Sequence, residues 1–176
     1  MVGFLVALVD DPATPDRESL VSLLHDVALW DVSLPLPDDF EPDEAFRAAA
    51  GHVESYVAWL AEPLLAAQAA EMLAYFPVSQ PVVDALLASA APASANLTLG
   101  YVSGFPSIDT HLTSALESMS ADVRMTAAVA LAFRLGSDLP TSALDLLVDE
   151  SPPPAPAGWD RSMRGFVTLA LRRVGL

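Results

Sequence analysis

The stretch of residues 121–150 has the clearest periodic spacing of apolar positions in the chain. Its first half repeats them at i, i+4, i+7 and i+8, which places them on one face of a helix: Val123, Ala127, Ala130, Leu131 and Leu135. Ser120 precedes this stripe as a candidate N-cap, and Gly136 follows it as a candidate helix end. Near Pro140 a second stripe begins, formed by Leu144, Leu147 and Val148. The stretch therefore predicts two amphipathic helices joined by a tight turn.

Apolar stripes with helical spacing recur along the rest of the chain. Thr14 and Ser107 precede two of these stripes as candidate N-caps, and Pro15 is a candidate first helical residue. Besides the helix that Thr14 begins, which carries Leu20 to Val27 inward, the pattern predicts helices over residues 2–9, 43–60, 63–76, 81–90, 93–102, 107–118 and 159–174.

Three short motifs occupy matching places near the ends of the first helices of successive pairs: Leu73-Ala74-Tyr75, Leu99-Gly100-Tyr101 and Leu131-Ala132-Phe133. They are 26 and 32 residues apart, and each is followed by a turn and another apolar pair. Helix–turn–helix units at such spacings are typical of a solenoid. We therefore predict an all-α fold, a single α-solenoid domain over residues 1–176 with about four hairpins and roughly ten helices. The helices at 2–9 and 159–174 lack a pairing helix and are half repeats, so we expect either a piece of a longer solenoid or self-association through the solenoid ends.

One part of the chain resembles the HEAT-repeat pattern of bacterial proteins. It comprises Asp122-Val123-Arg124, the Ala/Leu run after it, the Leu135-Gly136 turn and the helix over 143–148. Residues 2–17 and 59–76 are similar to HEAT-repeat proteins of high-GC actinobacteria. Other repeats depart from the Asp-Val-Arg signature. The resemblance implies a scaffold that binds a partner, although a few such families are enzymes.

Two proline-rich segments interrupt the helical pattern. Residues 30–42 contain three prolines and four carboxylates, which predicts an acidic insertion, either a solvated loop or a lid or docking segment that includes Trp30. Residues 151–158 predict a connector before the last helix.

The charge of the chain excludes several classes of partner and enzyme. It has 23 acidic residues against 8 basic ones, all arginine, and a formal net charge of −15. Residues 1–88 carry 15 acids and 2 arginines, net −13, whereas residues 89–176 carry 8 and 6, net −2. A field of this sign repels nucleic acid and anionic membranes. Without lysine the chain has neither a Schiff-base nucleophile nor a P-loop lysine.

The chain has no cysteine and no apolar run long enough to span a membrane. The apolar residues 2–9 lack a basic segment before them and run into Asp10 and Asp11, unlike a signal peptide. We therefore expect a cytoplasmic protein.

Four carboxylates follow directly after core positions of the predicted second helices. These residues, here named the acidic row, are Glu54, Asp84, Asp109 and Asp145. Each lies about 100° around its helix from the core direction, so the four predict a ladder along a concave groove. Neighbouring helices are about 8–10 Å apart, which is too far for the row to share one metal ion. The row instead suits a basic peptide or cationic ligand, or it is a set of solvated edge charges.

Histidine and aromatic residues gather on another flank of the same helices. His52, Tyr56 and Trp59 share one face of the helix over 43–60, and His111 occupies the equivalent flank two hairpins later. Such a stripe suits stacking of an organic ligand and proton transfer, or simply packing between repeats.

Other motifs do not support a metal site or a hydrolase. His25-Asp26 is expected on the outer side of its helix without a second ligand at i+4, and no HExxH motif is present. The segment Gly100–Gly104 lacks the GxSxG pattern and lies at a helix end. We expect no metal and no cofactor.

We therefore expect a non-enzymatic scaffold that binds a protein or a basic peptide in an acidic concave groove, with Glu54, Asp84, Asp109, Asp145, Tyr56 and Trp59 as its binding residues. The alternative is a small-molecule-binding protein or an enzyme of actinobacterial specialised metabolism, in which His52, His111, Asp109 and Asp84 are the catalytic candidates. A HEAT-like DNA glycosylase is a third hypothesis that the negative charge opposes.

Overall fold

The computed structural model describes residues 1–30, 32, 34–36 and 40–176. Over these residues the fold is all-helical, with eleven α-helices, one 3-10 helix and no strand. The α-helices are α1 (Val2–Asp10), α2 (Arg17–Leu29), α3 (Glu44–Ala50), α4 (Val53–Trp59), α5 (Ala66–Leu73), α6 (Gln80–Leu87), α7 (Pro92–Tyr101), α8 (Pro106–Ala115), α9 (Ala121–Leu135), α10 (Thr141–Asp149) and α11 (Met163–Val174), and the 3-10 helix is η1 (Gly136–Asp138).

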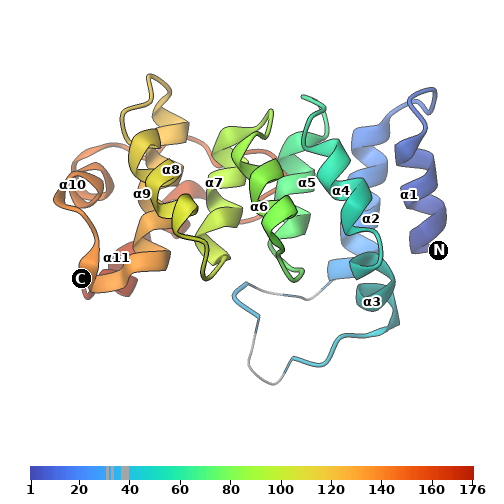
Figure 1. The fold of residues 1–176 in the computed structure, drawn as a ribbon, viewed down its shortest axis with the longest axis horizontal. Helices are drawn as coiled ribbons and strands as arrows, with labels where there is room; N and C mark the ends of the chain where they lie inside the picture. The colour runs from blue at the N-terminus through green and yellow to red at the C-terminus, as the bar shows by residue number, and fades with distance from the viewer. Residues whose placement is uncertain (31, 33, 37–39) are drawn as a thin grey trace.

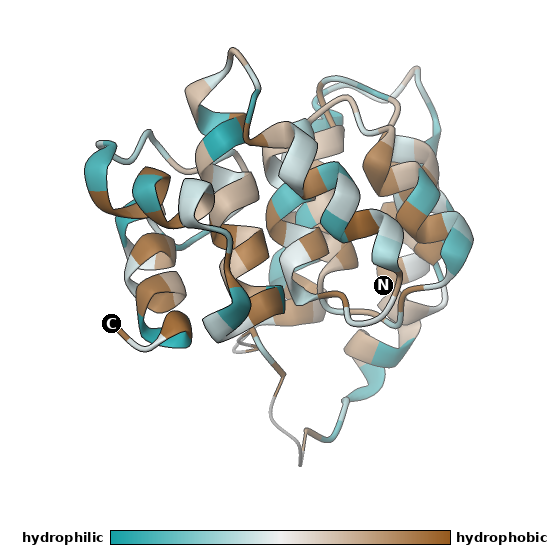
Figure 2. Ribbon diagram, turned by 60° about the vertical axis from the view of Figure 1, so that its left-hand side comes forward, coloured by the Kyte–Doolittle hydropathy of each residue, from teal (hydrophilic) through white to brown (hydrophobic). Residues whose placement is uncertain are grey.

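The helices follow one another along the long axis of the molecule nearly in chain order. Figure 1 shows α1 at one end and α10 and α11 at the other, with the chain termini at opposite ends. Helices α2, α5, α7, α9 and α11 pack in succession, and α4, α6 and α8 pack in succession beside them. Most helices carry both apolar and polar residues (Figure 2), so each can pack against its neighbours on one side and meet solvent on the other.

Helices α7 and α9 form the centre of the core. Residues 93–100 of α7 and 125–132 of α9 are buried without interruption. The close approach of these helices depends on a missing side chain, because a Cβ atom at Gly100 would lie 2.9 Å from Cα of Ala130. Small residues at facing positions therefore determine how closely α7 and α9 pack.

Polar side chains of α7 bond this helix to both neighbours. The hydroxyl group of Ser94 donates to the carbonyl oxygen of Ala67 on α5 at 2.7 Å, and Thr98 donates to Ala70 on the same helix at 2.5 Å. On the other side, the amide of Asn96 donates to the carbonyl oxygen of Val123 on α9 at 3.2 Å. The hydroxyl groups of Ser94 and Thr98 and the amide nitrogen of Asn96 thus have partners, whereas Oδ1 of Asn96 is buried without one among the described residues.

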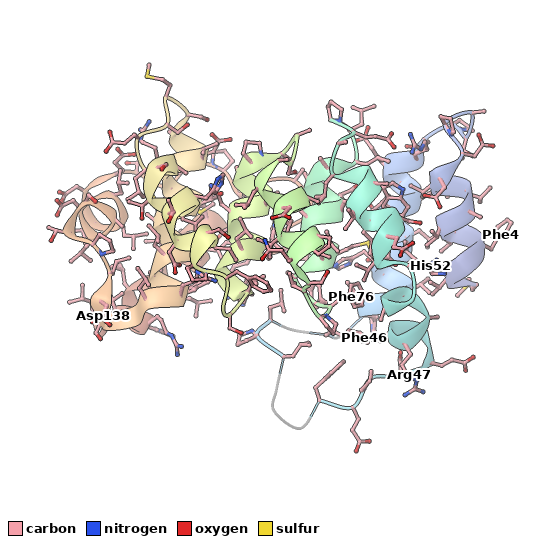
Figure 3. All side chains as sticks on the ribbon, viewed as in Figure 1. Phe4, Phe46, Arg47, His52, Phe76 and Asp138 are labelled. Atoms are coloured by element: carbon pink, nitrogen blue, oxygen red, sulfur yellow. The ribbon has the colours of Figure 1, made fainter. Side chains whose placement is uncertain are left out.

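The single long helix predicted over residues 43–60 is two helices in the structure. Helix α3 ends at Gly51, a residue that weakens a helix interior, and α4 begins after His52. The hydroxyl group of Tyr56 on α4 donates to the carbonyl oxygen of Ala49 at the end of α3, 3.0 Å away. The break lets α3 direct Phe46 against Phe76, with ring centroids 5.2 Å apart (Figure 3), while α4 buries its own aromatic side chains.

Three helix starts also differ from the prediction. Helix α2 begins at Arg17 rather than after Thr14, because Asp16 has a left-handed backbone with a φ of 53°. The side chain of Arg17 bonds to Glu62 and to the carbonyl oxygen of Val9. Helix α8 has Pro106 as its first residue, so Ser107 is inside the helix. Helix α11 begins at Met163, where the hydroxyl group of Ser162 accepts from the backbone N–H of Gly165.

The acidic insertion predicted at residues 30–42 is described only in part. Asp31, Asp38 and Asp39 lie outside the described residues, whereas Trp30 and Glu41 are exposed. Within the described chain, none of the helices has the length and apolar character needed to cross a bilayer.

Candidate functional site

The structure distributes the acidic row over α4, α6, α8 and α10. Glu54 and Asp84 are exposed, and the described residues provide no ion pair for either. Asp84 accepts a hydrogen bond from the amide of Gln80 at 2.7 Å. Asp145 is also exposed, but α10 packs mainly on α9 and α11 rather than beside α8. The structure thus brings α4, α6 and α8 together and sets Asp145 apart.

Asp109 differs from the other members of the acidic row because it has a cationic partner. Its Oδ1 accepts from Nε of Arg134 on α9 at 2.5 Å. Arg134 also donates to the carbonyl oxygens of Val102 and Gly104, the latter at 2.9 Å. Arg134 therefore neutralises Asp109 and holds the turn between α7 and α8, so Asp109 contributes little free negative charge.

A groove runs between α4 and α6 next to Glu54. The α4/α6 groove has a volume of about 500 Å³. It is lined by Ala50, Gly51, Val53, Glu54, Val57, Ser79, Pro81 and Val82. Its lining is mostly apolar, and Glu54 is its only charged residue. This combination suits a ligand that presents an apolar group and a cation together.

Tyr56 and Trp59, two predicted binding residues, are in the core. Tyr56 is 0% exposed and Trp59 is 1% exposed. The indole N–H of Trp59 donates to Oδ1 of Asp10 at 2.8 Å. Burial raises the pKa of Tyr56, with a smaller contribution from the charge of Asp10. Both side chains pack α4 against its neighbours and present no surface to a ligand.

The two histidines predicted as catalytic candidates belong to different parts of the molecule. The imidazole of His52 approaches α1, where a Cβ atom at Gly3 would lie 3.4 Å from Nε2. Figure 3 shows His52 in the half of the molecule that contains α1 and Phe4. His111 is on α8, and burial lowers its pKa. Neither histidine is among the residues that line the four cavities described in this section.

A histidine and a glutamate that the sequence did not connect form a buried pair. Nε2 of His25 on α2 lies 2.9 Å from Oε1 of Glu71 on α5. Glu71 is only 3% exposed. The sequence analysis placed His25 on the outer side of its helix, but α5 covers it. The sequence contained one indication of a buried charge, because Glu71 is the only charged residue between Glu62 and Asp84.

The environment of this pair favours retention of one proton. Burial lowers the pKa of His25, but the hydrogen bond and negative charge of Glu71, with the charges of Asp160 and Asp26, outweigh burial and raise it. Burial also raises the pKa of Glu71, against the opposing effects of His25 and Tyr75. Because the pKa of His25 and that of Glu71 are both raised, the pair gives up its shared proton at a higher pH than two isolated groups would.

Trp159 brings the connector before α11 against this pair. It was predicted to begin the last helix, but its indole N–H donates to Oγ of Ser94 on α7 at 2.8 Å. Its ring is stacked on Tyr101, with centroids 6.2 Å apart. Asp160 follows directly and faces the same region as Glu71. Residues 158–160, which lie before α11, are therefore part of this site.

A small polar cavity opens beside the pair. The α2/α5 cavity has a volume of about 280 Å³ and is lined by Val21, Ser22, His25, Asp26, Gln68, Glu71, Met72, Gly158, Trp159 and Asp160. A second cavity of about 140 Å³ shares Glu71, Trp159 and Asp160 with it and adds Tyr75 and Arg161. Among the described residues, no three histidine or acidic side chains are arranged to hold a metal ion.

A larger cavity of about 500 Å³ is formed around the turn after α7, between Tyr101, Phe133, Leu169 and Arg173. It includes residues 100–104, which the sequence analysis judged unlike a hydrolase elbow. No histidine or acidic residue lines it.

At the α1 end of the molecule an aromatic side chain faces solvent. Phe4 is 67% exposed, and Met1 beside it is exposed too. Self-association through this end, expected from the sequence, stays a prediction.

Comparison of the sequence with models of known protein families gives no match, and comparison with curated proteins also gives none.

Proposed function

We propose that this protein is a HEAT-like α-solenoid scaffold that binds a cationic, partly apolar segment of a partner protein across α4 and α6. The observation that carries the proposal is the α4/α6 groove of about 500 Å³, with Glu54 as its charged residue. One apolar side chain of the partner enters this groove, and an adjacent arginine or lysine pairs with Glu54.

The charge of the chain supports a cationic partner. Formal net charge is −15, and residues 1–88, which include α4 and α6, carry net −13. Long-range attraction of this kind raises the association rate of a basic segment and disfavours acidic competitors. Asp84 extends the negative surface from the groove along α6, whereas Asp109 is already paired with Arg134.

The packing of α4, α6 and α8 in succession supports a surface longer than one groove. In solenoids, successive helices of this kind form the extended surface on which partners bind. The burial of Tyr56 and Trp59 removes them from this surface. Glu54 and Asp84 are therefore the residues that we expect to govern affinity.

The proposal is tested with short fluorescein-labelled peptides that combine one large apolar residue with several arginines or lysines. Binding at low salt is measured by fluorescence anisotropy, and the tightest peptide is used against variants. Glu54→Arg combined with Asp84→Arg should weaken its binding at least about tenfold, because it replaces two attractive charges at the groove with repulsive ones. Affinity should also fall as salt rises.

The matched control is Glu18→Arg combined with Asp138→Arg, which makes the same change of net charge on α2 and η1, away from the groove. This control should weaken binding much less. Equal losses in the two double variants would show that only net charge matters, and the proposal would be rejected. Failure of every such peptide to bind would also reject it.

A further inference from the structure

The cavity around the turn after α7, here named the α7/α11 cavity, has the mostly apolar lining that is common in sites for small ligands. Its volume is about 500 Å³, and it is lined by Pro35, Gly100, Tyr101, Val102, Ser103, Gly104, Phe133, Arg134, Leu169 and Arg173. The side chains of Tyr101, Phe133 and Leu169 are each partly exposed, so a ligand can reach them. The cavity therefore accepts an apolar group that contacts aromatic and aliphatic side chains together.

The only charged residues that line this cavity are two arginines, Arg134 and Arg173. All three guanidinium nitrogens of Arg134 are engaged. Nε donates to Asp109, and the other two donate to the carbonyl oxygens of Val102 and Gly104. Arg173 is exposed, and the described residues provide no ion pair for it. Because Asp109 offsets the charge of Arg134, the cavity retains one positive charge, that of Arg173.

The end of the chain that contains Arg173 is basic, although the chain as a whole is acidic. Residues 161–176 contain four arginines and no acidic residue, whereas residues 1–88 carry net −13. Helix α11 packs on α9 at the end of the molecule opposite α1 (Figure 1). Charges separated by more than about 8–10 Å are largely screened at physiological salt, so the nearby arginines dominate the potential at the cavity. The cavity therefore attracts an anion in spite of the net charge of −15.

We propose that the α7/α11 cavity binds a small organic monocarboxylate that carries an apolar group. The carboxylate pairs with the guanidinium group of Arg173, a geometry that allows two parallel hydrogen bonds. The apolar group lies against Phe133 and Leu169. The hydroxyl group of Ser103 lines the same cavity, makes no hydrogen bond with the described residues and provides a further donor. One uncompensated arginine matches one carboxylate, so a dicarboxylate gains nothing from its second charge.

This site is separate from the proposed peptide surface. The α7/α11 cavity shares no lining residue with the α4/α6 groove, and the two favour ligands of opposite charge. The failure of either proposal therefore leaves the other standing.

The site is tested on the full chain with 3-phenylpropionate as the probe, by calorimetric titration and by the shift of the unfolding temperature at constant pH and ionic strength. Saturable binding and stabilisation are expected from this compound. Two comparison compounds should each bind at least about tenfold more weakly: 3-phenylpropylammonium, which reverses the charge, and propionate, which lacks the ring. Equal binding of either comparison compound, or no saturable binding of 3-phenylpropionate, would overturn the proposal.

Two arginine variants localise the carboxylate. Arg173→Gln should weaken the binding of 3-phenylpropionate at least about tenfold, because it removes the uncompensated cation from the cavity. Arg172→Gln is the matched control, since it makes the same change of charge at the neighbouring exposed position of α11, which does not line the cavity. It should change the affinity by less than about twofold. Equal losses in the two variants would mean that the carboxylate responds only to net charge, and the site would be refuted.

Two tryptophan variants localise the apolar group. Leu169→Trp reduces the free volume of the cavity and should weaken binding at least about fivefold. Thr168→Trp places the same side chain at the neighbouring exposed position, outside the lining, and should leave the affinity unchanged. Full affinity in Leu169→Trp would show that the ligand does not enter the cavity and would refute the site. Because Arg173 is exposed, its variant keeps the test valid if Leu169→Trp fails to fold.

A further arm identifies the source of the carboxylate. Nα-acetyl-phenylalanine carries the same ring and carboxylate with a peptide unit attached. Tighter binding of 3-phenylpropionate supports a free carboxylic acid as the ligand, because the cavity then excludes the peptide unit. Tighter binding of the acetylated amino acid supports the same carboxylate site with the C-terminus of a peptide as its occupant.

Discussion

Nε2 of His25 lies 2.9 Å from Oε1 of Glu71, although the two residues are 46 positions apart in the chain. The contact joins α2 to α5 and pairs the partly buried imidazole of His25 with the buried carboxyl group of Glu71. A buried pair of this kind is costly to break, because removal of one partner leaves the other without compensation. Stability should therefore depend on the protonation of this pair.

The first prediction is that the free energy of unfolding falls as pH rises above 6.5. The pKa of His25 is raised above its ordinary value of 6.5, so the folded state holds a proton that the unfolded state has already lost. The raised pKa of Glu71 acts in the same direction, from its ordinary value of 4.5 upward. The slope should not exceed about 1.4 kcal/mol per pH unit for one proton, as measured by urea unfolding at a series of pH values.

Two variants distinguish the pH dependence caused by the His25–Glu71 pair from that caused by other titratable groups. Glu71→Gln should remove most of the fall above pH 6.5, because it removes the charge that raises the pKa of His25. His111→Asn should leave that fall in place. Burial lowers the pKa of His111, so His111 reduces stability only as pH falls below 6.5. A wild-type stability that is flat or rising above pH 6.5 would contradict the assignment.

The second prediction concerns the contact of α7 with α9. Gly100→Ala should lower the free energy of unfolding by about 1–3 kcal/mol, because the new Cβ would lie 2.9 Å from the backbone of Ala130. Gly3→Ala is the matched control. Its Cβ would meet only the end of the His52 side chain at 3.4 Å, so alanine at this position of α1 should stabilise by up to about 1 kcal/mol. The free energy of unfolding of both variants is measured by chemical denaturation. We expect it to fall for Gly100→Ala and to rise for Gly3→Ala.

The third prediction concerns Arg134, whose side chain is 7% exposed. Arg134→Met keeps much of the volume but removes the bonds to Asp109 and to the carbonyl oxygens of the turn after α7. The free energy of unfolding should fall by about 2 kcal/mol. Arg164→Met on α11, where the described residues show no ion pair, should change it by less than about 0.5 kcal/mol. Equal effects in thermal unfolding would mean that the Arg134 contacts contribute nothing specific.

The fourth prediction tests the structural role assigned to Trp59. Asp10→Ala should cost about 1–3 kcal/mol, because the buried indole N–H of Trp59 and the hydroxyl of Ser55 lose their acceptor. Trp59→Phe in the Asp10→Ala background should cost less than in the wild type, as a double-mutant cycle would show. Glu117→Ala, which removes an exposed carboxylate, is the control and should be nearly neutral. Additive effects of Asp10→Ala and Trp59→Phe would contradict the bond.

The sequence by itself determined the helical character of the chain. Periodic apolar spacing is a local property, and it located nearly every helix to within a few residues, including α9 and α10 in the stretch first recognised. It placed Glu54 and Asp84 at exposed positions. The helix break at Gly51 was overlooked because the apolar stripe continues across it, although the glycine itself was visible.

Only the tertiary structure decided which polar groups meet. Arg17 bonds to Glu62 and to Val9, Asp109 forms an ion pair with Arg134, and His25 pairs with Glu71. These partners are 8 to 46 positions apart, so helical periodicity within one segment carries no information about them. Their meeting depends on how the apolar faces interlock and on the angle at which each helix crosses the next. The exposure of Glu54 and Asp84 was therefore accessible from sequence, whereas the cavity between α2 and α5 exists only once the helices are packed.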